Sequence, residues 1–196
     1  MLTIGVDIDL TIVPSDVYWE AWLKRHFEQI SEIPKENADY NLGRYFKESK
    51  NGLKHMDFWD NPHLYDEMEL LPGCYNALKA LKESGHNLLF ISHTRSGHFS
   101  SKFRLLSKLP FLEFESGSKD GFIATKEKGV LSPALNIMID DRNKFLNQFY
   151  DVKTVLFETR YTQDETPKVY DLQTSNWGEI VKYINKIDEE NKCQNK

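Results

Sequence analysis

Four short apolar runs, separated by segments of helical length, constrain the fold of this 196-residue chain most strongly. They occupy residues 2–8, 88–91, 136–139 and 154–157, and their composition is typical of strands buried on both faces of a sheet. Helices are expected between and after them, at about 17–32, 77–84, 99–109, 142–149 and 177–187. Strands that alternate with helices predict βαβ units and therefore a parallel sheet flanked by helices. We expect an α/β, Rossmann-like fold.

Polar side chains stand where three of these runs end. Asp7 and Asp9 close the first run, Ser92 closes the second, and Asp140 and Asp141 follow the third. In a parallel sheet the carboxyl ends of the strands share one edge, and α/β proteins bind ligands outside that edge. The acids and the hydroxyl are therefore expected to meet there.

The regular pattern breaks up after the first strand and returns at Leu71-Pro72-Gly73. We expect residues 1–13 and 72–188 to form an α/β core domain, and residues 14–71 to form a small helical cap inserted after the first strand. The charged residues 189–196 are expected to form a frayed tail.

The grouped carboxylates indicate a metal site and a nucleophile. Asp7, Asp9, Asp140 and Asp141 would repel one another at close range, and a hard cation with oxygen ligands, such as Mg²⁺, would stabilise them. With the charge screened, Asp7 can attack phosphorus and form an aspartyl-phosphate. Asp9 can protonate the leaving oxygen and later deprotonate the attacking water.

Further donors are needed to hold the phosphoryl group. Thr11 and Ser92 offer hydroxyl or backbone donors, and a lysine is expected to counter the charge. Lys119, Lys126 and Lys128 all precede the Asp140 strand, and spacing alone does not separate them.

Composition limits the partners. The formal net charge of -5 gives no sign of the basic face that a polynucleotide-binding protein presents, so polynucleotide binding is not expected. A small phosphorylated substrate is compatible with this negative charge. The two cysteines, Cys74 and Cys193, fit no metal spacing and predict free thiols in a reducing cytoplasm. No segment approaches the roughly 18 consecutive apolar residues that span a bilayer, so no membrane is expected. A homodimer is compatible with the sequence.

The order and spacing of the motifs resemble the four-motif signature of the haloacid dehalogenase superfamily over residues 1 to about 160: Asp7-x-Asp9-x-Thr11, Ser92, a lysine, and Asp140-Asp141. The dehalogenases of that superfamily lack the second aspartate. The resemblance therefore implies phosphatase or phosphotransferase chemistry.

Three stretches, at residues 69–73, 125–128 and 139–142, are similar to 5'(3')-deoxyribonucleotidases. The similarity points to Lys128 as the active-site lysine. It implies that Asp7 is the nucleophile and Asp9 the acid/base, with magnesium held by Asp140 or Asp141 and by the backbone carbonyl of Asp9. The implied substrate is a deoxyribonucleoside 5'- or 3'-monophosphate. One departure is Leu10, which stands where the family usually has glycine.

Candidates for contact with the substrate come from two regions. His93 and Arg95 follow Ser92, and Trp19 and Trp22 belong to an aromatic-rich part of the expected cap. Most cap aromatics are expected to pack its core, with one or two facing the substrate and stacking on a nucleobase.

Two alternatives stay open. One is a phosphatase of the same mechanism that acts on a sugar phosphate or a polynucleotide 3' end. The other is a non-catalytic binding module on this fold.

Overall fold

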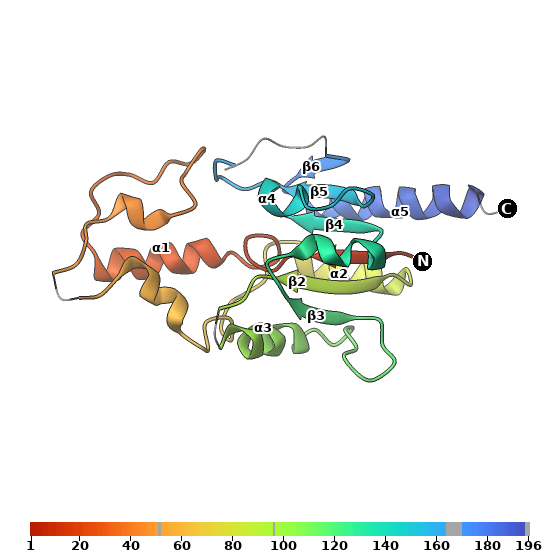
Figure 1. Cartoon of the computed structure of the whole chain (residues 1–196), viewed down its shortest axis with the longest axis horizontal. Coiled ribbons are helices and arrows are strands. Elements are labelled where there is room, and N and C mark those ends of the chain that lie inside the picture. The colour runs from red at the N-terminus through yellow and green to blue at the C-terminus, as the bar shows by residue number, and fades with distance from the viewer. Residues whose placement is uncertain (51, 96, 164–169, 195–196) are drawn as a thin grey trace.

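A six-stranded parallel sheet forms the centre of the computed structural model, which describes residues 1–50, 52–95, 97–163 and 170–194 (Figure 1). The strand order is β3-β2-β1-β4-β5-β6. The strands are β1 Thr3–Val6, β2 Asn87–Ser92, β3 Gly121–Ala124, β4 Ile137–Asp140, β5 Lys153–Phe157 and β6 Leu172–Thr174. Every neighbouring pair is parallel, which confirms the expected α/β, Rossmann-like fold.

Side chains of the central strands alternate between two hydrophobic cores. Phe90 of β2 and Ile139 of β4 join the larger core, whereas Ile91 and Met138, their chain neighbours, join the smaller one. All four are fully buried. Because both faces of the sheet are covered, these strands carry continuous apolar runs, which explains why they were predictable.

The helices follow the strands in chain order and cover the sheet. They are α1 Ser15–His26, α2 Cys74–Glu83, α3 His98–Ser107, α4 Asn143–Leu146 and α5 Trp177–Gln194, with 3-10 helices η1 Leu42–Tyr45, η2 His55–Asp60 and η3 Lys128–Ala134. Helices α2 and α5 pack against each other, and α4 packs against β4 and β5. None of the helices in the described ranges is long and apolar enough to cross a membrane.

Two strands were not predicted, and both lie at the edges of the sheet. β3 pairs only with β2, and its residues are half-buried or exposed. β6 has three residues and pairs only with β5. A strand that is partly exposed does not need an apolar run, so neither segment shows the signal that marks the central strands.

Two helix ends also differ from expectation. α1 ends at His26, not near residue 32, because the chain becomes extended at Phe27 and Ile30 N–H donates to Tyr45 O (2.9 Å). α5 continues to Gln194, so the described part of the expected frayed tail is helical, and residues 195–196 lie outside the described ranges. Asp188 holds this end of α5 through ion pairs with the amino group of Met1 (2.7 Å) and with Lys192 (2.5 Å).

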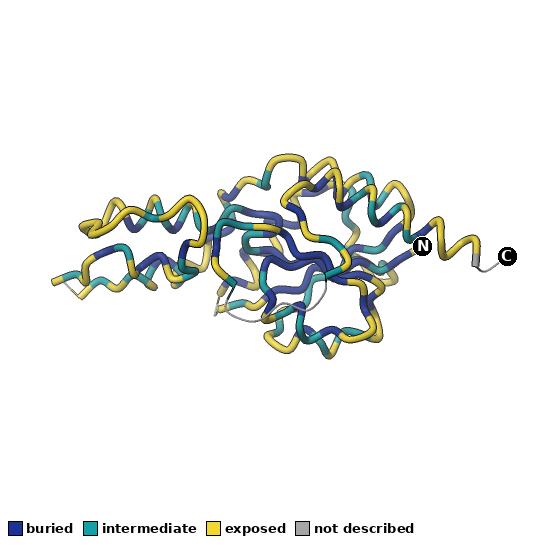
Figure 2. Tube along the Cα trace, turned by 90° about the horizontal axis from the view of Figure 1, so that it is seen from above, coloured by how far each residue is buried: buried dark blue, intermediate teal, exposed yellow. Residues whose placement is uncertain are grey.

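We call the segment between β1 and α2 the cap, and its division from the core as a separate domain stays a prediction. The chain between β1 and α2 carries α1, η1 and η2, which project beyond the carboxyl ends of the strands (Figure 1), and the same lobe extends from the sheet in Figure 2. One contact of this cap with the core is a parallel β-bridge between Ala38 and Tyr161, in the chain after β5.

Candidate active site

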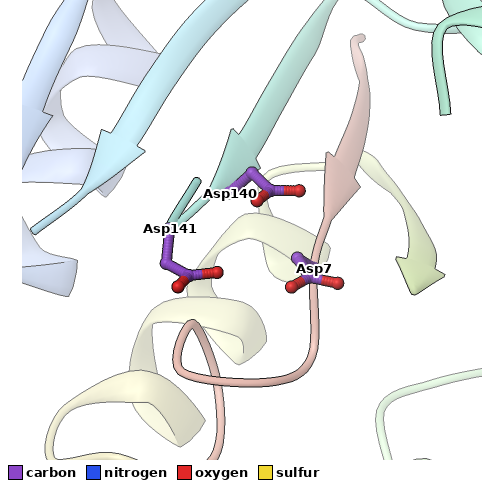
Figure 3. A group of neighbouring side chains, drawn as sticks. All are labelled: Asp7, Asp140 and Asp141. Atoms are coloured by element: carbon purple, nitrogen blue, oxygen red, sulfur yellow. The ribbon is translucent and has the colours of Figure 1, made fainter. Parts of the chain in front are cut away.

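Three aspartates lie together at the carboxyl edge of the sheet. Asp7 follows β1, Asp140 ends β4, and Asp141 comes directly after it. Figure 3 shows the three side chains converging, and one carboxylate oxygen of each lies within 4.8 Å of those of the other two. All three residues are buried. The prediction that acids from separate strands meet at one edge is confirmed in this geometry.

A tight loop carries Asp9 away from this group. Leu10 N–H donates to Val13 O (2.9 Å) and Ile12 N–H to Ile8 O (3.0 Å), so the chain turns back on itself immediately after the strand. The turn requires a positive φ of 58° at Leu10. Glycine adopts that conformation without strain, whereas for leucine it costs about 1–2 kcal/mol of conformational free energy. This difference gives a physical reason for glycine at this position in related chains.

Lys128 lies between two of the aspartates. Its side chain is fully buried, and Nζ is 2.8 Å from Asp7 Oδ1 and 2.6 Å from Asp140 Oδ2. Burial opposes the ammonium charge, but Asp140 and Asp7 outweigh burial and raise the pKa of Lys128 above its usual value. Lys119 and Lys126 are exposed instead. The geometry therefore singles out Lys128 from the three candidates.

Gly129 allows Lys128 to reach this position. A Cβ at residue 129 would lie 2.5 Å from Gln148 O and 2.9 Å from Gln148 Cβ, so η3 can pack against the chain after α4 only with glycine here.

We expect Gly129→Ala to displace η3, to lower the free energy of unfolding by about 1–3 kcal/mol, and to lower kcat because Lys128 moves with η3. Chemical denaturation and initial rates measure the two effects. Gly121→Ala is the matched control, because its added Cβ would meet only the flexible Leu89 Cδ1 at 3.0 Å. A Gly129→Ala protein with the stability and kcat of the Gly121→Ala protein would contradict this role.

Sequence reasoning missed a second buried lysine, Lys102 of α3. Its Nζ lies 2.6 Å from Asp9 Oδ2 and donates to Ser92 Oγ (2.8 Å) and His93 O (3.1 Å). The side chain is fully buried. The available signal was helical spacing, since Lys102 shares the buried face of α3 with Leu105 and Leu106.

Tyr65, also missed, completes the surroundings of Asp9. Its hydroxyl donates to Asp9 Oδ1 (2.9 Å), and Lys102 Nζ lies 4.8 Å from the Tyr65 ring centroid. Burial alone would raise the pKa of Asp9, but the charge of Lys102 and hydrogen bonds from Lys102, Tyr65 and Ser15 hold that pKa below its usual value. Each carboxylate of the Asp7/Asp9 pair thus has its own buried lysine.

The three grouped carboxylates fit a divalent cation. Burial raises the pKa of Asp140 to about 7, with the Lys128 charge opposing the rise and that of Asp7 adding to it. Burial and the charges of Asp140 and Asp7 raise the pKa of Asp141 well above its usual value. A hard cation with oxygen ligands would stabilise the ionised forms of both Asp140 and Asp141, and carboxylates are the ligands that Mg²⁺ prefers. Asp9 stands outside this group, because its side chain faces Lys102 and Tyr65.

Asp140 and Asp141 have different surroundings. Asp140 Oδ2 accepts from Lys128 Nζ (2.6 Å) and Oδ1 accepts from Arg142 N–H (3.0 Å), so the core holds both oxygens. Asp141 instead lines the cavity and accepts a hydrogen bond from the Tyr40 hydroxyl at Oδ2 (3.0 Å). Burial and the charge of Asp141 raise the pKa of Tyr40 far above its usual value, so its hydroxyl stays a donor.

A cavity of about 650 Å³ opens between these groups and the cap. Residues on its wall from both parts are Asp7, Asp9, Leu10, Ser15, Asp16, Trp19, Tyr40, Asn41, Met56, Trp59, Tyr65, Ser92, His93, Arg95, His98, Asp141, Arg142, Phe145 and Tyr161. Six of the predicted site residues of the core are on this wall, namely Asp7, Asp9, Ser92, His93, Arg95 and Asp141, and so is Trp19 of the cap. Arg95 also forms an ion pair with Asp60 of η2 (3.2 Å).

Two candidates for substrate contact lie elsewhere. Thr11 is fully buried, and its carbonyl accepts from Trp177 Nε1 (3.2 Å). Trp22 packs against Phe27 and Phe58, with ring centroids 5.5 and 5.9 Å apart. Neither lines the cavity, because Thr11 points into the core and Trp22 into the interior of the cap.

Comparison with known proteins identifies a family whose model matches this chain. The model of the family described as 5' nucleotidase, deoxy (pyrimidine), cytosolic type C matches residues 1–188. No curated protein matches the chain.

Solved structures resemble the chain in fold. A haloacid dehalogenase-like hydrolase from Burkholderia xenovorans LB400 has a TM-score of 0.57 at 18% identity, with 92% of this chain and 94% of that one covered. CbbY from Rhodobacter sphaeroides, solved in complex with phosphate, has a TM-score of 0.56 at 13% identity and coverage of 92% and 96%. A haloacid dehalogenase-like hydrolase from Xanthomonas campestris has a TM-score of 0.56 at 13% identity and coverage of 97% for both chains.

The family match spans nearly the whole chain, and the neighbours share its fold. The chain therefore belongs to the deoxy-type 5' nucleotidase family, and it is a phosphatase of the nucleotidase kind with the fold of haloacid dehalogenase-like hydrolases.

Proposed function

We propose that the protein is a magnesium-dependent phosphomonoesterase that hydrolyses deoxyribonucleoside 5'- or 3'-monophosphates through a phosphorylated Asp7. The observation that carries this proposal is the pairing of two cavity carboxylates with two fully buried lysines. Lys128 lies against Asp7, and Lys102 lies against Asp9 and Ser92. A binding module would have no need for this set of charged groups in one buried place.

In the first step a carboxylate oxygen of Asp7 attacks phosphorus while the bond from phosphorus to the ester oxygen breaks. The leaving oxygen takes a proton from Asp9, and Asp9 obtains that proton from solvent as the phosphate anion binds beside it. Lys128 keeps Asp7 in place, and Ser92, oriented by Lys102, donates to a phosphoryl oxygen.

In the second step Asp9, again a carboxylate, removes a proton from water, and the resulting oxygen attacks phosphorus. The acyl–phosphate bond breaks, which frees Asp7 and releases inorganic phosphate. The contacts from Lys102 and Tyr65 keep Asp9 in the ionised form that this step requires.

Magnesium, held by Asp7 and Asp141 and the carbonyl of Asp9, would neutralise charge on the phosphoryl group during both steps. Asp140 would contribute indirectly by fixing Lys128.

The cavity supports a mononucleotide as the substrate. Its volume of about 650 Å³ lies within the range typical of small-molecule sites, and residues of the cap form part of its wall. Trp19 and Trp59 on its cap wall meet edge to face, with ring centroids 5.4 Å apart, and offer aromatic surface to a base. A polynucleotide would need an open, basic groove.

We expect Trp59→Ala to raise KM for deoxynucleoside monophosphates by about tenfold or more, since a base–aromatic stack contributes about 1–3 kcal/mol. KM for deoxyribose 5-phosphate, which has no base, should change little. Trp22→Ala is the control, because Trp22 is an aromatic of the same cap that does not line the cavity. Equal increases in KM with and without the base would contradict a base-stacking role.

The direct test of the proposal is phosphate release from a panel of deoxy- and ribonucleoside monophosphates, sugar phosphates and 3'-phosphorylated oligonucleotides, with magnesium and with a chelator. The proposal expects magnesium-dependent turnover with deoxynucleoside monophosphates preferred. Preference for a sugar phosphate or an oligonucleotide would overturn the substrate assignment, and turnover in chelator would overturn the metal assignment.

A cytoplasmic location is supported by both cysteines being free thiols, Cys74 buried and Cys193 exposed. A homodimer stays a prediction.

A further inference from the structure

A tyrosine of the cap reaches the acidic group in the core. Tyr40 is 101 positions away from Asp141 in the chain, yet its hydroxyl lies 3.0 Å from Asp141 Oδ2. The same hydroxyl accepts from Gln163 Nε2 (3.2 Å). The hydroxyl also lies 3.0 Å from the backbone oxygen of Asp141. A phenol has one proton to donate, and a carboxylate is a stronger acceptor than a neutral carbonyl, so the proton belongs to the bond with the Asp141 carboxylate.

The position of this hydroxyl is set by contacts on every side of the tyrosine. The Tyr40 ring stacks on Tyr161, with centroids 4.8 Å apart and planes inclined at 24°. The guanidinium of Arg142 lies 4.3 Å from the centroid of the Tyr40 ring. The ring is therefore held between groups of the core, although it comes from the cap.

The backbone next to Tyr40 is fixed to the same part of the core. Ala38 N–H donates to Arg160 O (2.9 Å), and Thr162 N–H donates to Ala38 O (2.9 Å). Residues 38–41, which we call the docking segment, are thus joined at Ala38 to the loop after β5 by a β-bridge. The hydroxyl reaches Asp141 only while this bridge holds the segment in place.

Asp141 depends on this contact in a way that Asp140 does not. Both carboxylate oxygens of Asp140 are held by core groups, Lys128 Nζ and Arg142 N–H. In the described part of the chain, the Asp141 carboxylate instead accepts a hydrogen bond from Tyr40 of the cap. The orientation of the cavity-facing aspartate is therefore a property of the docked cap.

We propose that Tyr40 is a positioning residue that orients Asp141 for magnesium and so couples metal affinity to docking of the cap. This inference rests on the magnesium site of the proposed function. Because linkage is reciprocal, magnesium should also stabilise the bridge between Ala38 and Tyr161.

The test compares magnesium binding by wild type, Tyr40→Phe and Tyr18→Phe, by calorimetry and by the rise of Tm with magnesium concentration. Tyr40→Phe keeps the ring that stacks on Tyr161 and removes only the hydroxyl. We expect its magnesium Kd to rise about tenfold, the size of effect typical of groups that hold a metal ligand, with activity recovering at high magnesium. Tyr18 is the control because its hydroxyl also belongs to the cap, where it accepts from Glu69 N–H (3.1 Å), but Tyr18 does not line the cavity.

Amide hydrogen exchange supplies a second measurement. If Tyr40 had only a structural role, its substitution would not change the effect of magnesium on exchange. Magnesium should slow exchange at Ala38 and Thr162, the two donors of the bridge, in wild type and in Tyr18→Phe. In Tyr40→Phe this effect of magnesium should be lost or much reduced, because the link from metal to docking segment is cut.

The outcomes separate this inference from the proposed function. If Tyr40→Phe binds magnesium like wild type, or if magnesium protects its Ala38 amide as in wild type, the inference is overturned and the proposed function stands. If wild type shows no more stabilisation by magnesium than Asp141→Asn does, the magnesium site itself is refuted, and this inference fails with it.

Discussion

Asp7→Asn is expected to reduce the rate of phosphate release by at least about 10³-fold, the largest effect of any single substitution here. The change keeps the shape of the side chain and removes the anionic oxygen that attacks phosphorus. Lys128 keeps its contact with Asp140 (2.6 Å), so its charge is still balanced and the fold should survive. Initial rates with a deoxynucleoside monophosphate, together with Tm and circular dichroism, measure activity and fold separately.

Asp16→Asn is the matched control for this substitution. Asp16 is another aspartate on the cavity wall, but it pairs with the Tyr161 hydroxyl (2.7 Å) and with Arg160 (3.3 Å), not with the lysines of the site. We expect it to reduce the rate far less than Asp7→Asn does. If the Asp7→Asn protein released phosphate as fast as the Asp16→Asn protein, Asp7 could not be the nucleophile.

Lys102→Met should have the second-largest effect, a fall in kcat of about 10²–10³-fold for nucleotides. Methionine preserves most of the buried volume of the lysine but removes the charge beside Asp9 and the donor to Ser92. Both the acid/base carboxylate and the serine hydroxyl would then lose their fixed orientation. The drop should be smaller for nitrophenyl phosphate, whose leaving group departs without a proton from Asp9.

Lys82→Met separates this effect from a loss of stability. Lys82 also pairs with a buried aspartate, Asp120 (2.8 Å), but it lies on α2 and does not line the cavity. We expect it to lower Tm with little change in kcat. If Lys102→Met lowered Tm as Lys82→Met does and left kcat intact, with no difference between leaving groups, Lys102 would be a structural residue only.

The central sheet and its acidic edge could be predicted because both rest on local signals. Strands buried on both faces must be apolar throughout, and polar residues at their ends interrupt the pattern visibly. Asp7, Ser92 and Asp140 are each the first polar group after such a run. Their convergence follows from parallel topology alone, with no knowledge of side-chain packing.

Lys102 and Tyr65 could not be found in this way, because neither follows the apolar run of a central strand. Lys102 is one of 25 basic residues in the chain, and its spacing from the apolar residues of α3 does not by itself connect it with Asp9. Its burial is a consequence of α3 packing beside Asp9, a contact between residues 93 positions apart. Tyr65 reaches Asp9 across 56 positions from the end of the cap.

The cap aromatics show the same limit. Trp19 and Trp22 are three residues apart on α1, yet Trp19 lines the cavity and Trp22 packs inside the cap. The direction in which each ring points depends on how α1 sits against η2, which composition does not reveal. Edge strands β3 and β6 were missed for the related reason that partial exposure removes the apolar pattern.

The most direct measurement of the central claim is a rapid acid quench during turnover of a labelled deoxynucleoside monophosphate, followed by peptide mapping. Hydroxylamine cleaves an acyl-phosphate. The mechanism predicts one hydroxylamine-sensitive phosphoryl group, on the peptide that contains Asp7, and it predicts that the Asp7→Asn protein carries no such group. Steady turnover with the label on a residue other than Asp7 would contradict the mechanism. So would steady turnover without any hydroxylamine-sensitive phosphoprotein, even when the Asp9→Asn substitution is used to slow the second step.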